Sequence, residues 1–299
     1  MIIAAGYLWR FFDPGGLDRH RVRHALNVTV FNFFLPALAF GLVAGARVDR
    51  SFISIPATAV AVVVLCTAAF FAVYRLIPGI RDLPGPVFGV LMLAAVFGNV
   101  TYLGLPVIAE MLGPGQAYAA ILYDQLASTP ILLTAGVFLA ARYGKGKAVS
   151  IGASLKRVAL LPPLWGVVAG LAIRLSGWAV PQIILDTAAL MGKAVIPLMT
   201  FTVGLALDFR DVKRLPIAAP ALAIKLLLAP ILAWWVGSRL GLSGATLKAV
   251  TIEGAMPVMV LSLVIADEFE LDVPLAAACI AGSTVLLFIT LPLVMKMLF

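Results

Sequence analysis

Three ionisable side chains lie inside long apolar stretches of this sequence, where a charge is unfavourable. They are Asp124, which is followed by Gln125, and then Lys225 and Glu253. In the middle of a bilayer a charge costs at least ~2.5 kcal/mol, so such residues usually pair with one another or mark an ion or substrate pathway. Helix rise puts Asp124 and Lys225 both within roughly 5 Å of the membrane centre. They serve either charge compensation or a fixed ion pair that braces two helices, and both interpretations stay open.

Glu253 differs from this pair because the sequence offers it no obvious basic partner. It stands four residues before Pro257, at a point where its apolar run is interrupted. A proton, a cation such as Na⁺ or a polar group of a substrate would satisfy its carboxylate. We therefore expect Glu253 to serve in coupling.

Two apolar runs are interrupted near their middle by glycine, proline and a polar side chain. The interruptions are Gly98–Pro106 and Glu253–Pro257. Proline removes a backbone donor, and glycine lowers the cost of leaving the helix. Freed backbone groups are tolerated at membrane depth only where they line a cavity or find a partner. Two such interruptions in corresponding positions predict a polar cavity between them, although each one alone could be an ordinary proline kink.

The elements that position these residues are transmembrane helices. Hydrophobic residues make up 63% of the 299 residues and charged residues 12%, and the mean hydropathy is +1.09. A soluble domain has about twice that share of charged residues. Ten apolar stretches are predicted as helices. They are Met1–Phe12, Ala25–Ala46, Phe52–Leu76, Pro86–Leu112, Gln116–Arg142, Leu155–Leu175, Pro181–Leu207, Pro216–Arg239, Ala245–Ala266 and Val273–Leu298. The first is too short to span, and it either lies partly at the interface or is the end of a longer helix.

The ten helices divide into two halves that resemble each other. Leu35–Phe40 and Ile196–Phe201 share the same spacing from proline to phenylalanine. Because each half has five helices, the second copy enters the membrane upside down, an inverted repeat typical of secondary transporters. We expect one transmembrane domain with repeat one at 1–142, a basic linker at 143–154 and repeat two at 155–299.

Charge in the loops predicts the orientation. Lys and Arg are about twice as frequent in loops that follow odd-numbered helices as in the other loops. This bias puts the linker 143–154 in the cytoplasm and both termini outside. The net charge of +8 is explained by these loops and does not require a nucleic-acid partner. Cys66 and Cys279 are isolated in apolar runs, and no metal-ligand cluster or nucleophile–base arrangement has useful spacing, so an enzyme is not expected.

The interrupted segments resemble those of a known family. The run Asn99–Pro106, and Gly254–Pro257 followed by Leu263–Phe269, are similar to the fourth and ninth helices of the auxin efflux carrier family. Phe34–Phe40 and Lys225–Pro230 are similar to its second and eighth helices. This family includes the plant PIN-FORMED exporters and bacterial carriers of dicarboxylates such as malonate and malate.

The resemblance implies a fold and a site. The fold is an all-α polytopic membrane protein with ten helices in two inverted repeats, whose broken fourth and ninth helices cross at prolines that carry over to Pro106 and Pro257. The family's carboxylate-binding asparagine carries over to Asn99. Glu253 stands where plant members tend to have an uncharged polar residue, and it resembles the sodium-site glutamate of the bile acid:sodium symporters, a related fold. The expected substrate-binding residues are Asn99, Thr101, Tyr102, Gly104, Pro106, Met256 and Pro257.

The resulting expectation is a secondary transporter of a small mono- or dicarboxylate in a bacterial inner membrane. Na⁺ or H⁺ is the expected coupling ion, with Glu253 and Asn99 as candidate Na⁺ ligands and Asp124, Gln125 and Lys225 compensating charge. A sodium-coupled importer of the bile acid:sodium symporter type is the alternative, and a non-transporting membrane sensor is a lesser one. The expected partners are the organic anion and the lipid bilayer. A homodimer is one assembly that the sequence leaves open.

Overall fold

The computed structural model describes residues 1–12, 14–76, 82–145 and 149–299, and these form helices without a β-strand. Parts of two loops predicted above, 77–81 and 146–148 in the basic linker, lie outside the described residues. The α-helices are α1 (Ile2–Phe12), α2 (Arg19–Thr29), α3 (Leu35–Gly45), α4 (Ser51–Leu76), α5 (Gly85–Val96), α6 (Leu105–Leu112), α7 (Ala117–Tyr123), α8 (Thr129–Ile131), α9 (Val137–Tyr143), α10 (Ile151–Ala159), α11 (Pro162–Ser176), α12 (Gln182–Ala206), α13 (Leu215–Ala223), α14 (Ala229–Arg239), α15 (Gly244–Ala255), α16 (Leu261–Glu268) and α17 (Val273–Leu298). The π-helical segments are η2 (Val30–Phe34), η3 (Val100–Gly104), η5 (Asp124–Ser128), η6 (Leu132–Gly136) and η8 (Ile224–Leu228), and the 3₁₀ turns are η1 (Pro14–Gly16), η4 (Pro114–Gln116) and η7 (Val212–Arg214).

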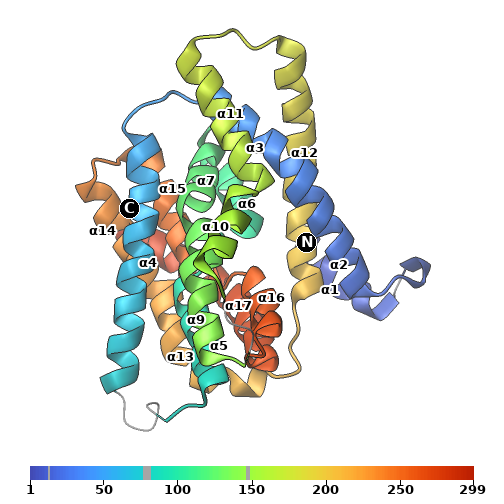
Figure 1. Ribbon diagram of the computed structural model, residues 1–299, viewed down its shortest axis with the longest axis vertical. Coiled ribbons are helices and arrows are strands. Elements are labelled where there is room, and N and C mark those ends of the chain that lie inside the picture. The colour runs from blue at the N-terminus through green and yellow to red at the C-terminus, as the bar shows by residue number, and fades with distance from the viewer. Residues whose placement is uncertain (13, 77–81, 146–148) are drawn as a thin grey trace.

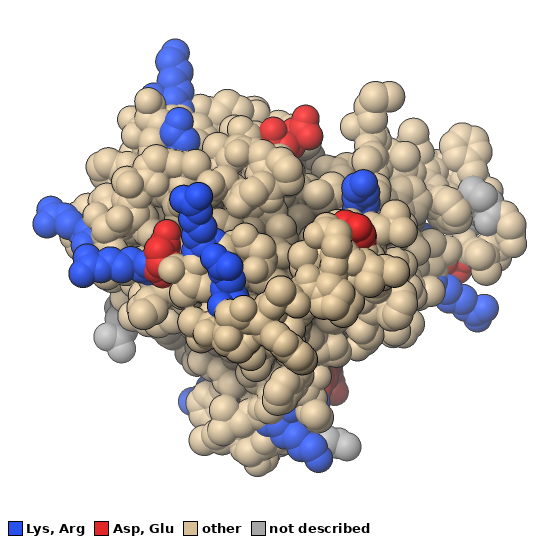
Figure 2. Space-filling view, turned by 90° about the horizontal axis from the view of Figure 1, so that it is seen from above, with Lys and Arg blue, Asp and Glu red and all other residues tan. Residues whose placement is uncertain are grey.

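Apolar helices long enough to cross a bilayer dominate the fold. Among the described residues six stretches meet this test: Arg19–Gly45, Ser51–Tyr74, Pro114–Tyr143, Gln182–Ala206, Val212–Arg239 and Val273–Leu298. The pair α10 and α11 meets it as one span bent by 56°. Seen from above, most of the surface carries neither basic nor acidic side chains (Figure 2). The all-α membrane fold expected from the sequence is confirmed, while the ten-helix inverted repeat stays a prediction.

The helices pack as two bodies. In the first, which we call the panel, α3 packs on α11 and α12, and α1 and α2 pack along α12 (Figure 1). The second, which we call the core bundle, joins α4, α5, α7 and α9 to α13, α14, α15 and α17. Both apolar runs with a predicted interruption fall in the core bundle.

Four of the π-helical segments directly precede a proline. Each ends two residues before it: η2 before Pro36, η3 before Pro106, η5 before Pro130 and η8 before Pro230. A proline ring lacks an N–H and clashes with the carbonyl four residues earlier, and a wider turn relieves both problems. Asp124 and Lys225 both lie in such segments, so the prolines help to set where these charged side chains point.

Hydrogen bonds and ion pairs define the two ends of the molecule. At one end the Lys145 N–H donates to the Phe269 carbonyl at 3.1 Å, and Arg157 pairs with Glu268 at 3.1 Å. We call this the linker end. At the other end the Ser54 hydroxyl donates to the Leu240 carbonyl at 2.9 Å. We call this the opposite end.

Panel and core bundle meet through a buried apolar cluster. It joins panel residues of α3 and α12 to the broken fourth helix and to α7, and includes Leu35, Val195, Met199, Val100 and Leu103. Apolar burial stabilises by about 25 cal/mol per Å². We call this contact the seam.

The predicted helix boundaries hold with three differences. The second helix begins at Arg19 instead of Ala25, because its polar first turns are helical and Asp18 caps them by accepting from the His20 N–H at 3.0 Å. The last four residues of the predicted linker belong to α10, so the chain from Ile151 is already helical. The predicted sixth helix, Leu155–Leu175, is two helices, because the prolines at 162 and 163 start a new helix at a bend.

Candidate functional site

The fourth and ninth predicted helices are both broken in the middle. The fourth is α5, an extended stretch at 97–99, then η3 and α6; the ninth is α15, a non-helical stretch at 256–260, then α16. Phe97 and Met256, the residues that end the two first halves, have extended backbones with ψ of 121° and 144°. The breaks leave backbone N–H and carbonyl groups without helical partners in the centre of the core bundle.

The two extended stretches satisfy part of this need by pairing with each other. They run antiparallel, with the Asn99 N–H donating to the Pro257 carbonyl at 2.7 Å and the Met259 N–H donating to the Phe97 carbonyl at 3.1 Å. We call this the crossing. Two helix ends with free carbonyls and two with free N–H groups converge there, so the crossing offers partial charge of both signs to a ligand.

Asn99 is a polar side chain at the crossing whose amide nitrogen is left without a hydrogen-bond acceptor among the described residues. It is 3% exposed, and its side-chain Nδ2 has no hydrogen-bond partner among the described residues. It precedes the first turn of η3, whose leading N–H groups have no partner inside the helix. Leaving a buried donor unsatisfied costs about 1–3 kcal/mol, so an acceptor placed here would be held.

Asn99 lines a cavity of about 380 Å³ between the panel and the core bundle. This volume falls within the usual range of small-molecule sites. Its wall is Arg23, His24, Asn27, Val28, Phe31, Asn32, Asn99, Thr101, Tyr102, Asp124, Thr129, Leu133, Leu161, Met259, Val260, Leu261 and Val264. His24 is exposed and lies in the second turn of α2, while Leu161 directly precedes α11. The cavity therefore runs from the crossing toward the linker end.

Asp124 lines the cavity together with two of its hydrogen-bond donors, Thr101 and Thr129. Its carboxylate accepts hydrogen bonds from the Thr101 hydroxyl, from Gln125 Nε2 at 2.7 Å and from the Thr129 hydroxyl at 2.7 Å. All four side chains belong to η3, η5 and α8. An ionised carboxylate only accepts, so three donors turned toward it stabilise its charge and tie the start of η3 to the fifth predicted helix.

Lys225 occupies the other side of the crossing. Its Nζ donates to the Gly254 carbonyl at 2.8 Å, and the residue is 2% exposed. The ammonium thus serves the C-terminal end of α15, where carbonyls lack partners and the helix dipole is negative. A Cβ built on Gly98 would lie 2.8 Å from the Lys225 Cε, so a larger residue at this point of the crossing would require the Lys225 side chain to shift.

Of the two interpretations left open for Asp124 and Lys225, the fixed ion pair between them is not formed among the described residues. Among the described residues neither forms an ion pair: Asp124 is held by three neutral side chains and Lys225 by a backbone carbonyl. Asp124 is bound by side chains of η3, η5 and α8, whereas Lys225 reaches the C-terminal end of α15.

Glu253 is fully buried and neither of its carboxylate oxygens has a hydrogen-bond partner among the described residues. It packs against Gly104 of the other broken helix, where an added Cβ would lie 2.6 Å from Oε1. It does not belong to the cavity wall, and Asn99, its predicted companion for Na⁺, does.

Sequence similarity to known proteins covers the whole chain. A family model described as a membrane transport protein matches residues 1–295. The chain belongs to this membrane transport protein family. The resemblance to auxin efflux carriers seen in the interrupted helices is thereby confirmed at the level of the family.

Relatives of this membrane transport protein occur in archaea and bacteria. An uncharacterized transporter of Methanothermobacter thermautotrophicus is 30% identical over 304 residues, with 98% of this chain and 94% of the relative covered. An uncharacterized transporter of Methanocaldococcus jannaschii is 25% identical over 292 residues, covering 95% and 91% of the two chains. The uncharacterized transporter YfdV of Escherichia coli K12 is 25% identical over 275 residues, covering 90% and 86%.

The residues expected to bind the substrate of this membrane transport protein fall into two groups. Asn99, Thr101 and Tyr102 line the cavity, as does Asp124. Three others do not line it and lie at the crossing: Gly104 packs on Glu253, Pro257 supplies a carbonyl and Met256 is fully buried. Gln125, which was expected to compensate charge, donates to Asp124 and does not line the cavity.

Pro106 was expected at the crossing but lies beyond it. It is in the first turn of α6, after η3. The fourth helix leaves helical geometry instead at Phe97–Asn99, where Gly98 allows the close approach of Lys225. Pro257 is at the crossing as expected.

The panel side of the cavity was missed by sequence reasoning. Arg23, Asn27 and Phe31 follow one another at intervals of four, which puts them on one helix face. The interval could have revealed them. Arg23 was overlooked because it lies before Ala25, the predicted start of the second helix.

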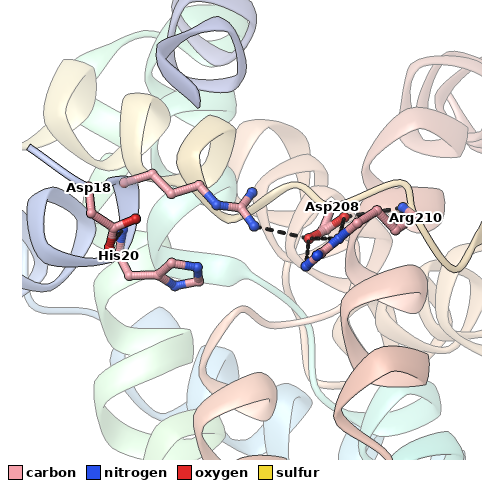
Figure 3. Close-up of polar contacts among 5 residues, drawn as sticks. Asp18, His20, Asp208 and Arg210 are labelled. Carbon is pink, nitrogen blue, oxygen red and sulfur yellow. Dashed lines mark hydrogen bonds and ion pairs between the residues drawn. The ribbon is translucent and has the colours of Figure 1, made fainter. Parts of the chain in front are cut away.

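An ion cluster lies one turn before Arg23, at the linker end. Asp208, which follows α12, accepts from Arg19 Nη2 at 3.0 Å and from Arg210 Nη2 at 2.7 Å (Figure 3). Burial alone would raise the pKa of the Asp208 carboxyl, but the hydrogen bonds from Arg210 and Arg19 hold it well below its usual range. The cluster fastens the start of α2 to the end of α12 and leaves Asp208 fully engaged.

Proposed function

We propose that this protein is a secondary transporter that carries a small organic anion across the membrane by alternating access. The family supports transport in general. The observation that supports the anion is the buried, unpartnered Nδ2 of Asn99, which lines a cavity of about 380 Å³ beside the start of a helix. Free N–H groups at a helix start attract negative charge.

In this proposal a carboxylate binds at the crossing. One oxygen accepts from the Asn99 amide, and the other faces the first N–H groups of η3. Asp124 holds the Thr101 hydroxyl and thereby keeps the start of η3 in place. The ten helices form two inverted repeats, so the crossing lies near the bilayer centre, where such carriers bind their substrates.

The described conformation fits one step of this cycle. The cavity leads to the linker end, and the seam separates it from the opposite end. With the linker in the cytoplasm of a bacterial cell, as the loop charges predict, the cavity faces inward and both termini lie outside. Transport then requires the core bundle to move against the panel so that the seam opens.

Glu253 favours ion coupling within the same mechanism. A buried carboxyl with two unpartnered oxygens beside the crossing can take a proton or contribute to a Na⁺ site. The second candidate function, a sodium-coupled importer of the bile acid:sodium symporter type, rests on this residue. A requirement for Na⁺ that disappears in Glu253→Gln favours the second candidate, whereas a pH dependence that disappears in the same variant favours proton coupling.

The test is ligand-dependent thermal stability of the purified protein against a panel of carboxylates, with Na⁺ or K⁺ and at two pH values. A ligand at 100 times its Kd should stabilise the protein by ~2.7 kcal/mol. We expect this shift in the wild type and in Gln182→Ala, a control at an exposed amide of α12. Asn99→Ala should lose it. If no carboxylate stabilises the wild type, or Asn99→Ala retains the full shift, the proposal is wrong.

A further inference from the structure

Arg23 is a cationic side chain of the cavity wall that has no acidic partner in the part of the chain that the structure describes. It lies in the second turn of α2 and is half-buried. Among the described residues it forms neither an ion pair nor a hydrogen bond through its side chain. A guanidinium presents five N–H donors in a rigid fork. A half-buried guanidinium without an acceptor is therefore available to bind an anionic group of a ligand.

The acidic groups in the neighbourhood are already engaged elsewhere. Asp208 is shared by Arg19 and Arg210, and Asp18 accepts from the His20 N–H. Asp124 lines the same cavity, but its carboxylate takes hydrogen bonds from three neutral side chains of the core bundle. Arg23 therefore brings to the cavity a guanidinium that forms no ion pair with the acidic side chains of the described residues.

Arg23 and Asn99 face one cavity from different bodies. Arg23 comes from the panel and Asn99 from the crossing in the core bundle. Tyr102, which follows Asn99 by three residues and also lines the cavity, lies within electrostatic reach of the Arg23 guanidinium. Asn27 stands one turn from Arg23 on the same helix face and adds an amide between the two ends of the cavity.

We propose that Arg23 binds a second anionic group of the substrate, so that this carrier selects dianions over monoanions. The inference rests on the proposed function, in which Asn99 and the start of η3 hold the first carboxylate. The second carboxylate accepts two parallel N–H bonds from the guanidinium, a geometry that lysine cannot reproduce. A dicarboxylate thus bridges the panel and the core bundle.

The test compares ligands that differ by one charge. Succinate and glutarate are each measured beside their monomethyl esters, which keep the carbon chain and lose one carboxylate. Affinities are taken from thermal shifts or calorimetry of the purified protein at constant pH. The variants are Arg23→Gln and Arg23→Lys, and the matched control is Arg21→Gln, at an exposed basic residue of the preceding turn that lies outside the cavity wall.

We expect the wild type and Arg21→Gln to bind a dicarboxylate at least tenfold more tightly than its monoester. In Arg23→Gln the affinity for the dicarboxylate should fall by about tenfold or more, because a hydrogen bond to a charged group is lost. The affinity for the monoester should change little. The affinity of Arg23→Lys for the dicarboxylate should lie between those of the wild type and Arg23→Gln. Unliganded thermal stability and the gel-filtration profile check that each variant is folded.

Three results would overturn the inference. Equal weakening of dicarboxylate and monoester in Arg23→Gln would mean a general or lipid-directed role for the guanidinium. An equal loss in Arg21→Gln would mean nonspecific attraction. A wild type that binds monoesters as well as dicarboxylates would remove the second subsite while leaving the proposed function intact. If no carboxylate binds to the wild type, the proposed function itself is wrong.

Discussion

Glycine at position 104 allows the unpartnered carboxylate of Glu253 to pack against the other broken helix. A Cβ there would lie 2.6 Å from Glu253 Oε1. We expect Gly104→Ala to lower the free energy of unfolding by about 1–3 kcal/mol, because the buried carboxylate has to move. Thermal unfolding of the purified protein measures this.

The matched control for that substitution is Gly152→Ala in α10. There the nearest atom to an added Cβ is the Ser150 hydroxyl oxygen at 3.6 Å, so no displacement is needed. The double variant Gly104→Ala with Glu253→Ala should recover most of the loss. If Gly104→Ala and Gly152→Ala are equally stable, the close contact does not exist in the protein.

The Asp208 cluster predicts a dependence of stability on pH. The pKa of this carboxyl is lower in the folded protein than in the unfolded chain, because Arg210 and Arg19 donate to it. Its stabilising contribution is therefore complete above the ordinary aspartate pKa of about 4 and fades as the pH falls below that value.

We expect Asp208→Asn to unfold at lower temperature than the wild type by the same interval at pH 7 and pH 5.5. The interval should shrink below about pH 4, where the unfolded aspartate begins to bind a proton. Asp186→Asn, at an exposed carboxylate of α12, is the control and should change little. A difference in unfolding temperature between the wild type and Asp208→Asn that grows on acidification would contradict the predicted role of the cluster.

At the scale of elements, the π-helical segments set which side chains meet. Thr129 follows Asp124 by five residues, and its hydroxyl donates to that carboxylate at 2.7 Å. Five residues of a regular α-helix turn a side chain roughly 140° away from the first, whereas the wider π turn brings the two nearly into line. The bond therefore depends on η5, and η5 on Pro130.

We expect Pro130→Ala to let η5 relax toward α-helix and to weaken carboxylate binding by about tenfold, with a smaller effect on thermal stability. Pro292→Ala is the control, because Pro292 lies inside α17 without a preceding π-helical segment. Binding measured by thermal shift separates the two. Unchanged binding in Pro130→Ala would show that Asp124 keeps its donors without the π turn.

At the scale of the whole molecule, the seam predicts different accessibility at its two sides. Asn27 lines the cavity toward the linker end, whereas Val195 is buried in the seam. In a Cys66→Ala, Cys279→Ala background, Asn27→Cys should react with an impermeant maleimide from the linker side, and a bound dicarboxylate should slow this reaction.

The companion variant Val195→Cys should stay unreactive from the linker side. It should react from the opposite side only when the seam opens during transport. Rates of labelling in right-side-out and inverted vesicles measure both positions. Labelling of both cysteines from one side would contradict alternating access across the seam.

Much of this architecture could be predicted because long apolar runs and their interruptions are local signals. The last helix, Val273–Leu298, has the same bounds in prediction and structure, and both central breaks were expected. The partner of Lys225 could not be predicted, since it depends on rotation about helix axes that the π-helical segments change. Arg23 was missed because a basic residue near a helix start has the same pattern whether it faces solvent or a cavity.

The antiparallel bonds of the crossing fasten the two broken helices into one unit, so the first carboxylate travels with the core bundle while Arg23 stays with the panel. A substrate bound to both the crossing and Arg23 therefore acts as a spacer, and its length determines how closely the panel and the core bundle can approach each other. A short, flexible dianion lets the gap close behind it. A dianion of the same charge with a rigid, bulky middle would bind to both subsites and keep the two bodies apart. Such a compound would be an inhibitor that binds to the carrier without being transported.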